Sequence, residues 1–117
     1  MNHRKKAHEV IAVKRYRYIL NGCVLGEDKI SDYRLIAGNN IKPSYNGEVA
    51  IRVNIPDDLE LTKYSRDPYS TTHDKRTIDE LGYDVLIWNE GKSKWEIHNE
   101  FKGVRPCDIP LDFKSKV

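Results

Sequence analysis

The chain has 117 residues, of which 38% are hydrophobic and 32% are charged. This size predicts one globular domain with a single core and excludes two full-sized domains. No uninterrupted apolar run is longer than that of residues 85–88, which is far shorter than the roughly 20 residues that cross a bilayer, so we expect no membrane contact.

Charge and cysteine content narrow the classes of function. Residues 1–53 carry ten Lys and Arg against five Asp and Glu, residues 54–117 carry ten against thirteen, and the net charge is +2. So small a net charge is not typical of a dedicated nucleic-acid protein, although its uneven distribution can steer a partner. Cys23 and Cys107 are too few for a disulfide framework, and Glu9 interrupts the apolar run that a signal peptide needs. We therefore expect a cytoplasmic protein.

The first predicted element is a strand. From residue 9 to residue 20, β-branched and aromatic residues dominate and no helical period fits. Asn21 and Gly22 then supply the positive φ angles of a type I′ turn. Residues 23–29 are therefore predicted to return as the second strand of a hairpin.

Alternation along this first strand separates its rings from its cations. Tyr16 and Tyr18 share one face and Arg15 and Arg17 share the other, because successive side chains of a strand point to opposite sides. The turn sets Tyr18 opposite Leu25, which predicts that the tyrosines face the core and the arginines face solvent. A platform that stacks bases needs rings and cations on one exposed surface, so this strand does not predict one.

The middle of the chain gives one ambiguous segment and one clear strand. In residues 30–40, Ser31 can begin a short helix, whereas the alternation of apolar residues through Leu35 favours a strand. Residues 49–55 alternate clearly, with four β-branched residues on one face, and Pro56 ends the run.

A polar connection then leads to a helix. The helix is predicted from about Asp74 to Leu81, with Thr71 or Thr72 near its N-cap. Gly82 is predicted to end it, because glycine adopts the left-handed conformation that closes a helix.

A second hairpin follows, in which residues 83–89 and the strand that begins at Lys94 flank a four-residue loop. The loop length sets Trp88 opposite Trp95 and Leu86 opposite Ile97. We predict that this face packs into the core and that the face of Tyr83, Val85 and Ile87 points outward. The tail is predicted to pack as irregular chain through four apolar side chains: Val104, Ile109, Leu111 and Phe113.

Together these elements predict an α+β fold, a β-rich small domain. Its antiparallel sheet has about five or six strands, from two hairpins plus a central strand, with one short helix. Residues 1–7 are predicted to be a flexible basic arm, and residues 8–117 the single globular domain.

The second hairpin also carries the residues that are best suited to metal binding or acid-base chemistry. Glu96, His98 and Glu100 share one strand face at alternate positions. Same-face Cα atoms lie about 6.6 Å apart, so three ligands from one strand seldom converge on one ion. A solvent-facing side of the hairpin explains these residues more simply.

His73 and His98 suggest a second chemistry, that of a metal-independent ribonuclease. Such an enzyme needs a base, an acid and a cation near the phosphate, and Lys75 and Arg76 follow His73. No spacing supports the pair, and capping and solvation of a helix start explain His73 equally well. The sequence contains no motif of a nucleotide, metal or acyl-transfer site, so we expect no cofactor and favour a protein that is not an enzyme.

The first functional hypothesis is therefore a small, non-catalytic intracellular protein that recognises and inhibits a protein partner by occlusion. Such accessory roles occur in phage and other mobile elements, and smallness without motifs is compatible with one. Tyrosine and arginine give contact area at interface centres. The predicted contact residues are Tyr64, Arg66, Tyr69, Tyr83, Val85 and Ile87.

The alternative is a nucleic-acid binder that uses the basic arm and the first strand. Its phosphate contacts would be Arg4, Lys5, Lys6, Arg15 and Arg17. This hypothesis predicts binding that weakens steeply with salt.

Overall fold

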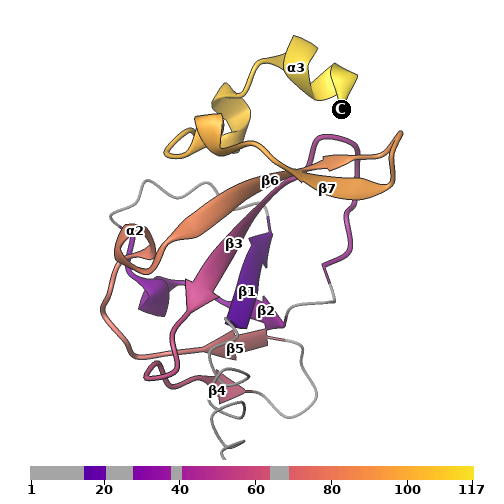
Figure 1. The fold of residues 1–117 in the computed structure, drawn as a ribbon. Helices are drawn as coiled ribbons and strands as arrows, with labels where there is room; N and C mark the ends of the chain where they lie inside the picture. Colours follow the sequence, from indigo (N-terminus) through magenta and orange to yellow (C-terminus); the bar gives the residue numbers. More distant parts are fainter. Residues whose placement is uncertain (1–14, 21–27, 38–40, 64–68) are drawn as a thin grey trace, which may run out of the picture.

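The computed structural model of the protein describes residues 15–20, 28–37, 41–63 and 69–117. Within these ranges the chain forms a single antiparallel sheet of seven strands, in the order β4-β5-β2-β1-β3-β6-β7 (Figure 1). The antiparallel, β-rich prediction is confirmed, and the strand count is higher than the five or six predicted.

The described elements are short, none longer than seven residues. The strands are β1 Arg15–Leu20, β2 Leu35–Ala37, β3 Val49–Ile55, β4 Thr62–Lys63, β5 Tyr69–Thr71, β6 Tyr83–Asn89 and β7 Lys94–Ile97. The α-helices are α2 Ile78–Leu81 and α3 Leu111–Lys116, and the 3₁₀ helices are η1 Ile30–Asp32, η2 Asn99–Phe101 and η3 Pro106–Asp108.

Strand β3 lies between β1 and β6 and organises the core. Its alternate side chains from Val49 to Ile55 are buried, as the sequence predicted. Directly opposite residues of antiparallel strands share a face, so Ile19 of β1 and Val85 of β6 join Ile51 in one layer. This layer is the centre of the core cluster, which we call the core face of the sheet.

Strand β1 pairs with β2 and β3, and not in the hairpin that was predicted. Tyr18 lies between Ile36 of β2 and Arg52 of β3, so neither side of it is open to Leu25. The predicted turn and most of its return strand, residues 21–27, lie outside the described residues. Two non-local strands with apolar faces to bury have displaced the pairing that the local turn signal favoured.

The extra strands come from segments that the sequence left open. Residues 30–37 hold both predicted alternatives, because η1 precedes β2 in the same segment. Strands β4 and β5 pair within the segment that was predicted only as a polar connection.

Helix α2 begins later than predicted. Thr77 is its N-cap: the Thr77 hydroxyl accepts from the Glu80 N–H, and the Thr77 N–H donates to the Glu80 carboxylate. The hydroxyl of Thr72 instead accepts from the Asp74 N–H and forms a local turn. Gly82 ends the helix with φ of +92°, as predicted.

The register of the second hairpin is confirmed, with Trp88 opposite Trp95 and Leu86 opposite Ile97. The prediction of which face is core is wrong. Tyr83, Val85 and Ile87 are buried in the core cluster, whereas Ile97 is 55% exposed. Both faces of β6 are apolar, so alternation alone could not decide between them; the segments that cover the sheet decide.

Helices and tail cover the core face. Ile30 of η1, Ile78 of α2 and Phe113 of α3 all pack in or against the core cluster. The last helix lies beside β6 and β7, away from β4 and β5 (Figure 1). Ile109 is buried as predicted, but Leu111 is 81% exposed, contrary to prediction, because it begins α3 on the helix side away from Phe113. None of the described helices is long and apolar enough to span a bilayer.

Candidate binding surface

The face of the sheet opposite the core cluster, here called the outer face, carries the candidate site. The described helices that contribute to the core cluster all lie on the core face, so they leave the outer face to side chains of the strands. Cross-strand register sorts this face into parallel rows, because residues directly opposite one another are neighbours on the same side.

One row is apolar across four strands. Leu20 lies opposite Ala50, Ala50 opposite Leu86, and Leu86 opposite Ile97. Ala50 and Leu86 are buried in the middle of this row, and exposure rises to 55% at Ile97 on β7. The row therefore ends in an exposed aliphatic side chain at the edge of the sheet.

Two indoles border this row on one side. The rings of Trp88 and Trp95 meet edge to face, with centroids 5.4 Å apart and planes 63° apart. Both side chains are partly exposed. An edge-to-face pair fixes both rings, so the two indoles present a preformed apolar surface at low entropic cost.

Tyrosines and a charged pair border the row on its other side. The Arg52 guanidinium lies 5.0 Å from the ring centre of Tyr16, which is 38% exposed, and 2.7 Å from the Asp84 carboxylate. Asn99 donates a further hydrogen bond of 3.0 Å to Asp84. Burial opposes ionisation of Asp84, but the hydrogen bonds from Asn99 and Arg52 outweigh it and lower the pKa of Asp84. Arg52 is thus a cation whose charge is already matched.

A shallow pocket of about 230 Å³ lies over this charged pair. Tyr16, Arg52 and Asp84 line it, together with Lys102. The Lys102 ammonium lies 4.8 Å from the ring centre of Tyr83. The pocket wall therefore combines two cations, one carboxylate and aromatic surface.

The predicted sorting of rings and cations on β1 is wrong. Tyr16 and Tyr18 lie on the outer face, opposite Asn54 and Arg52, and not in the core layer. Arg17 lies opposite Val53 on the core face, where it is partly buried and does not form an open cationic strip. The reason is that β1 is an interior strand of the sheet and that Ile19 is buried in the core. Because side chains alternate, Arg17 then shares the core face with Ile19, and the tyrosines lie on the outer face.

The other predicted contact residues are scattered. Tyr69 of β5 is on the outer face, where Arg34 lies 5.2 Å from its ring centre. The side chains of Tyr83, Val85 and Ile87 are buried, so they do not form the exposed patch that was predicted. Arg4, Lys5, Lys6, Tyr64, Arg66 and the side chain of Arg15 lie outside what the structure describes.

The three predicted metal ligands do not share one strand face, because β7 ends at Ile97 and Glu100 lies in η2. The imidazole of His98 lies between two carboxylates, with Nε2 3.7 Å from Glu96 and Nδ1 3.4 Å from Glu100. The two nitrogens thus face different carboxylates and do not point at one common ion. Within the described ranges, no group of three or more His, Cys, Asp or Glu side chains is arranged to hold a metal ion.

The two histidines of the ribonuclease hypothesis are far apart. His73 follows β5 and His98 follows β7, and four strands separate β5 from β7. Strands lie about 4.8 Å apart, so the distance across the sheet is about 24 Å, too far for one reaction centre.

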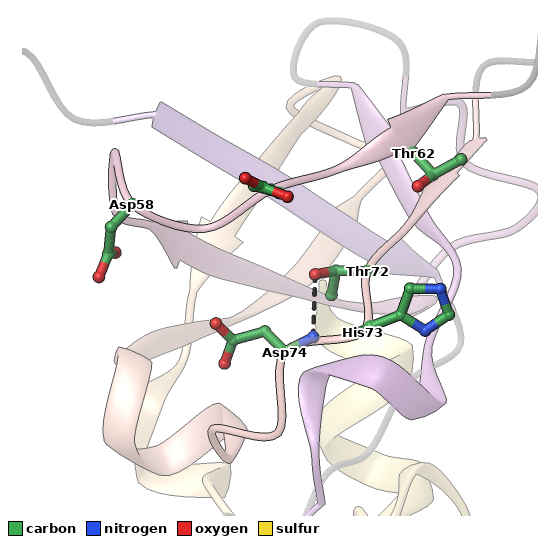
Figure 2. Close-up of a pocket in the computed structure, with 6 residues that line it drawn as sticks. Asp58, Thr62, Thr72, His73 and Asp74 are labelled. Carbon is green, nitrogen blue, oxygen red and sulfur yellow. Dashed lines mark hydrogen bonds between the residues drawn. The ribbon is translucent and has the colours of Figure 1, made fainter.

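His73 instead borders an acidic pocket of about 230 Å³ (Figure 2). Asp58 and Asp74 line this pocket, and Arg76 bonds to both, at 3.2 and 2.8 Å. The His73 ring points away from the Asp74 carboxylate (Figure 2). The carboxylates are thus engaged in holding the loop before α2, and they do not form an acid-base pair with His73.

No protein-family model, curated protein or solved structure matches this chain. The candidate surface therefore depends on geometry alone. Sequence reasoning found Trp88 and Trp95 as a pair but assigned them to the core, and it missed Arg52 and Asp84. The sequence did contain a signal for this pair, because Arg52 and Asp84 are charged residues within two strands that are otherwise mainly apolar.

Proposed function

We propose that the chain is a non-catalytic binding protein that recognises another protein through the outer face of β6 and β7. The observation that carries this proposal is the exposed Ile97 beside the preformed Trp88 and Trp95 pair. Aromatic and aliphatic side chains that are fixed in advance and partly exposed are typical of interface centres. An inhibitory role by occlusion fits a small domain with an exposed apolar side chain at the edge of its sheet, and the setting we propose is the cytoplasm.

Charge supports a protein rather than a polynucleotide as the partner. Phosphate backbones require cations that are free to neutralise them. On the outer face, the guanidinium of Arg52 is matched by Asp84, and the adjacent row is apolar. Protein interfaces tolerate such matched pairs at their rim, around an apolar centre.

Nucleic-acid binding is the second candidate, and one observation favours it. Arg52 lies over the ring of Tyr16, so a ring and a cation do share one surface, contrary to what the sequence predicted. A base could stack on Tyr16 if Arg52 exchanged Asp84 for a phosphate. The two candidates differ in salt dependence, because only the second releases many counterions.

The test compares two exposed aliphatic side chains on different surfaces. The immobilised protein is incubated with lysate of its source organism, and retained proteins are quantified by mass spectrometry for wild type, Ile97→Lys and Leu111→Lys. Leu111 is the matched control, because it is more exposed than Ile97 but lies on α3 and outside the sheet. We expect Ile97→Lys to lose at least about tenfold of the specific partner, a cost of about 1.4 kcal/mol, and Leu111→Lys to keep it.

Two results would contradict the proposal. One is a partner that Ile97→Lys retains as well as wild type. The other is retained RNA or DNA that elutes between about 50 and 200 mM salt, which would favour the second candidate.

A further inference from the structure

Strand β7 is an edge strand of the sheet that the described residues form. It lies at one end of the strand order, and β4 at the other end has two residues against four in β7. An edge strand presents backbone N–H and C=O groups that can pair with another strand. Within the described part of the chain, β6 is the strand that pairs with β7.

The hydrogen-bond pattern shows which backbone groups face outward. The His98 N–H donates to the Val85 carbonyl at 2.8 Å, so the backbone of His98 faces β6. Bonding groups alternate along an antiparallel strand, so those of Glu96 also face β6. The N–H and C=O of Trp95 and Ile97 therefore point away from the sheet.

The side chains of β7 separate into an apolar side and a charged side. Trp95 and Ile97 lie on the outer face, whereas Lys94 and Glu96 lie on the core face. A shallow groove of about 470 Å³ runs along this edge, lined by residues 94–98. A strand laid in the groove would meet aromatic surface on one side and alternating charge on the other.

We propose that two copies of this chain pair edge to edge through antiparallel β7 strands, around a two-fold axis at Trp95. In this register the outward N–H and C=O of Trp95 bond to the same groups of the second copy. Glu96 of each copy lies opposite Lys94 of the other, so symmetry creates two opposite-charge pairs. The strand is thus complementary to itself, and a second copy is the occupant that its charges specify.

Charge also selects this register over its neighbour. A shift of the axis by one residue would set Glu96 opposite Glu96, and like charges directly opposite each other are destabilising. The hydrogen bond from Asn89 is the main cause that lowers the pKa of Glu96, so its carboxylate is ionised near neutral pH. Lys94 is exposed and can reach across the edge.

The pairing would extend the proposed binding surface. The two outer faces would join into one continuous sheet, and the Trp88 and Trp95 pair of each copy would meet at the axis. This row of four indoles follows from dimerisation alone. It can therefore be tested on the purified chain without any other partner.

The experiment measures mass by sedimentation velocity for wild type, Lys94→Glu and the double variant Lys94→Glu/Glu96→Lys. We expect a wild-type species of twice the 13.6 kDa chain mass. Lys94→Glu sets Glu opposite Glu twice and should raise the dimer dissociation constant at least about tenfold. The double variant reverses both charges, restores the two opposite-charge pairs and should dimerise again.

Three results would overturn the inference. They are a wild-type chain that stays monomeric at about 1 mM, where even weak interfaces associate; a dimer that Lys94→Glu leaves unchanged; and a double variant that folds but stays monomeric. Thermal unfolding of each variant verifies the fold. Lys94 is exposed, so Lys94→Glu is expected to fold even where Glu96→Lys disturbs the contact with Asn89. A monomeric wild-type chain would overturn the dimer but would not contradict the proposal that Ile97 contacts another protein.

Discussion

The two faces of the sheet differ in what covers them more than in what they contain. On β6, Val85 and Leu86 are neighbours in sequence and both are buried, Val85 in the core cluster and Leu86 in the apolar row of the outer face. The described helices and the tail pack against the core face, whereas the apolar row of the outer face is formed by side chains of the strands themselves. An apolar side chain on a strand therefore indicates a face that is either buried in the core or available for binding. The segments that cover the sheet decide between these two outcomes.

The largest effect that tests this difference between the faces is the loss of stability from a cavity on the core face. Ile51 is 1% exposed at the centre of β3, so Ile51→Ala should lower the free energy of unfolding by about 3 kcal/mol. Ile97→Ala, which removes the same atoms from the outer face, should cost less than about 1 kcal/mol. Equilibrium unfolding in urea measures both. Equal losses would show that Ile97 is packed in solution and that the outer face is not open.

The comparison also explains what the sequence could predict. Period-two alternation correctly predicted which side chains of β3 share a face, because one side is β-branched and the other includes Arg52 and Asn54. The length of the four-residue loop correctly predicted the register of the second hairpin, because so short a loop leaves the two strands little freedom to shift. These features depend on local geometry, which the sequence specifies directly.

The direction in which each strand faces could not be predicted in the same way. In β6 both sides are apolar, and in β1 a tyrosine side competes with the side of Ile19. The orientation depends on which face η1, α2 and the C-terminal tail pack against, and alternation within a strand carries no information about that packing. The candidate site differs from the prediction for the same reason. Val85 faces the core, so Trp95 lies on the opposite, outer face.

A smaller effect tests the charged border of the outer face. Arg52 and Asp84 are 25% and 28% exposed, so water screens their ion pair. A double-mutant cycle with Arg52→Gln and Asp84→Asn should give a coupling of about 0.5 kcal/mol in unfolding free energy. The coupling should shrink at high salt. A coupling near zero would mean that Arg52 is free, which would favour the nucleic-acid candidate over a protein partner.

The smallest effect concerns the loop that leads into α2, under the core face. The hydrogen bonds from the side chain and backbone of Arg76 lower the pKa of Asp74 to about 2, below its ordinary value of 3.8. A carboxyl whose pKa is lower in the folded state stabilises the fold above its unfolded pKa. That contribution should be complete above about pH 5 and fade as the pH falls toward 2.

Asp74→Asn should therefore be less stable than wild type at pH 7, and the difference should close between about pH 5 and pH 2. Urea unfolding across this range measures the effect, with Arg76→Gln as the matched variant that removes the other partner. Both variants should flatten the same acid limb, because each breaks one contact between the same two side chains. If Asp74→Asn kept the wild-type acid limb, the loop would owe its position to Asp58 and the capping of α2 by Thr77, and the acidic pocket would be free to bind a cationic group.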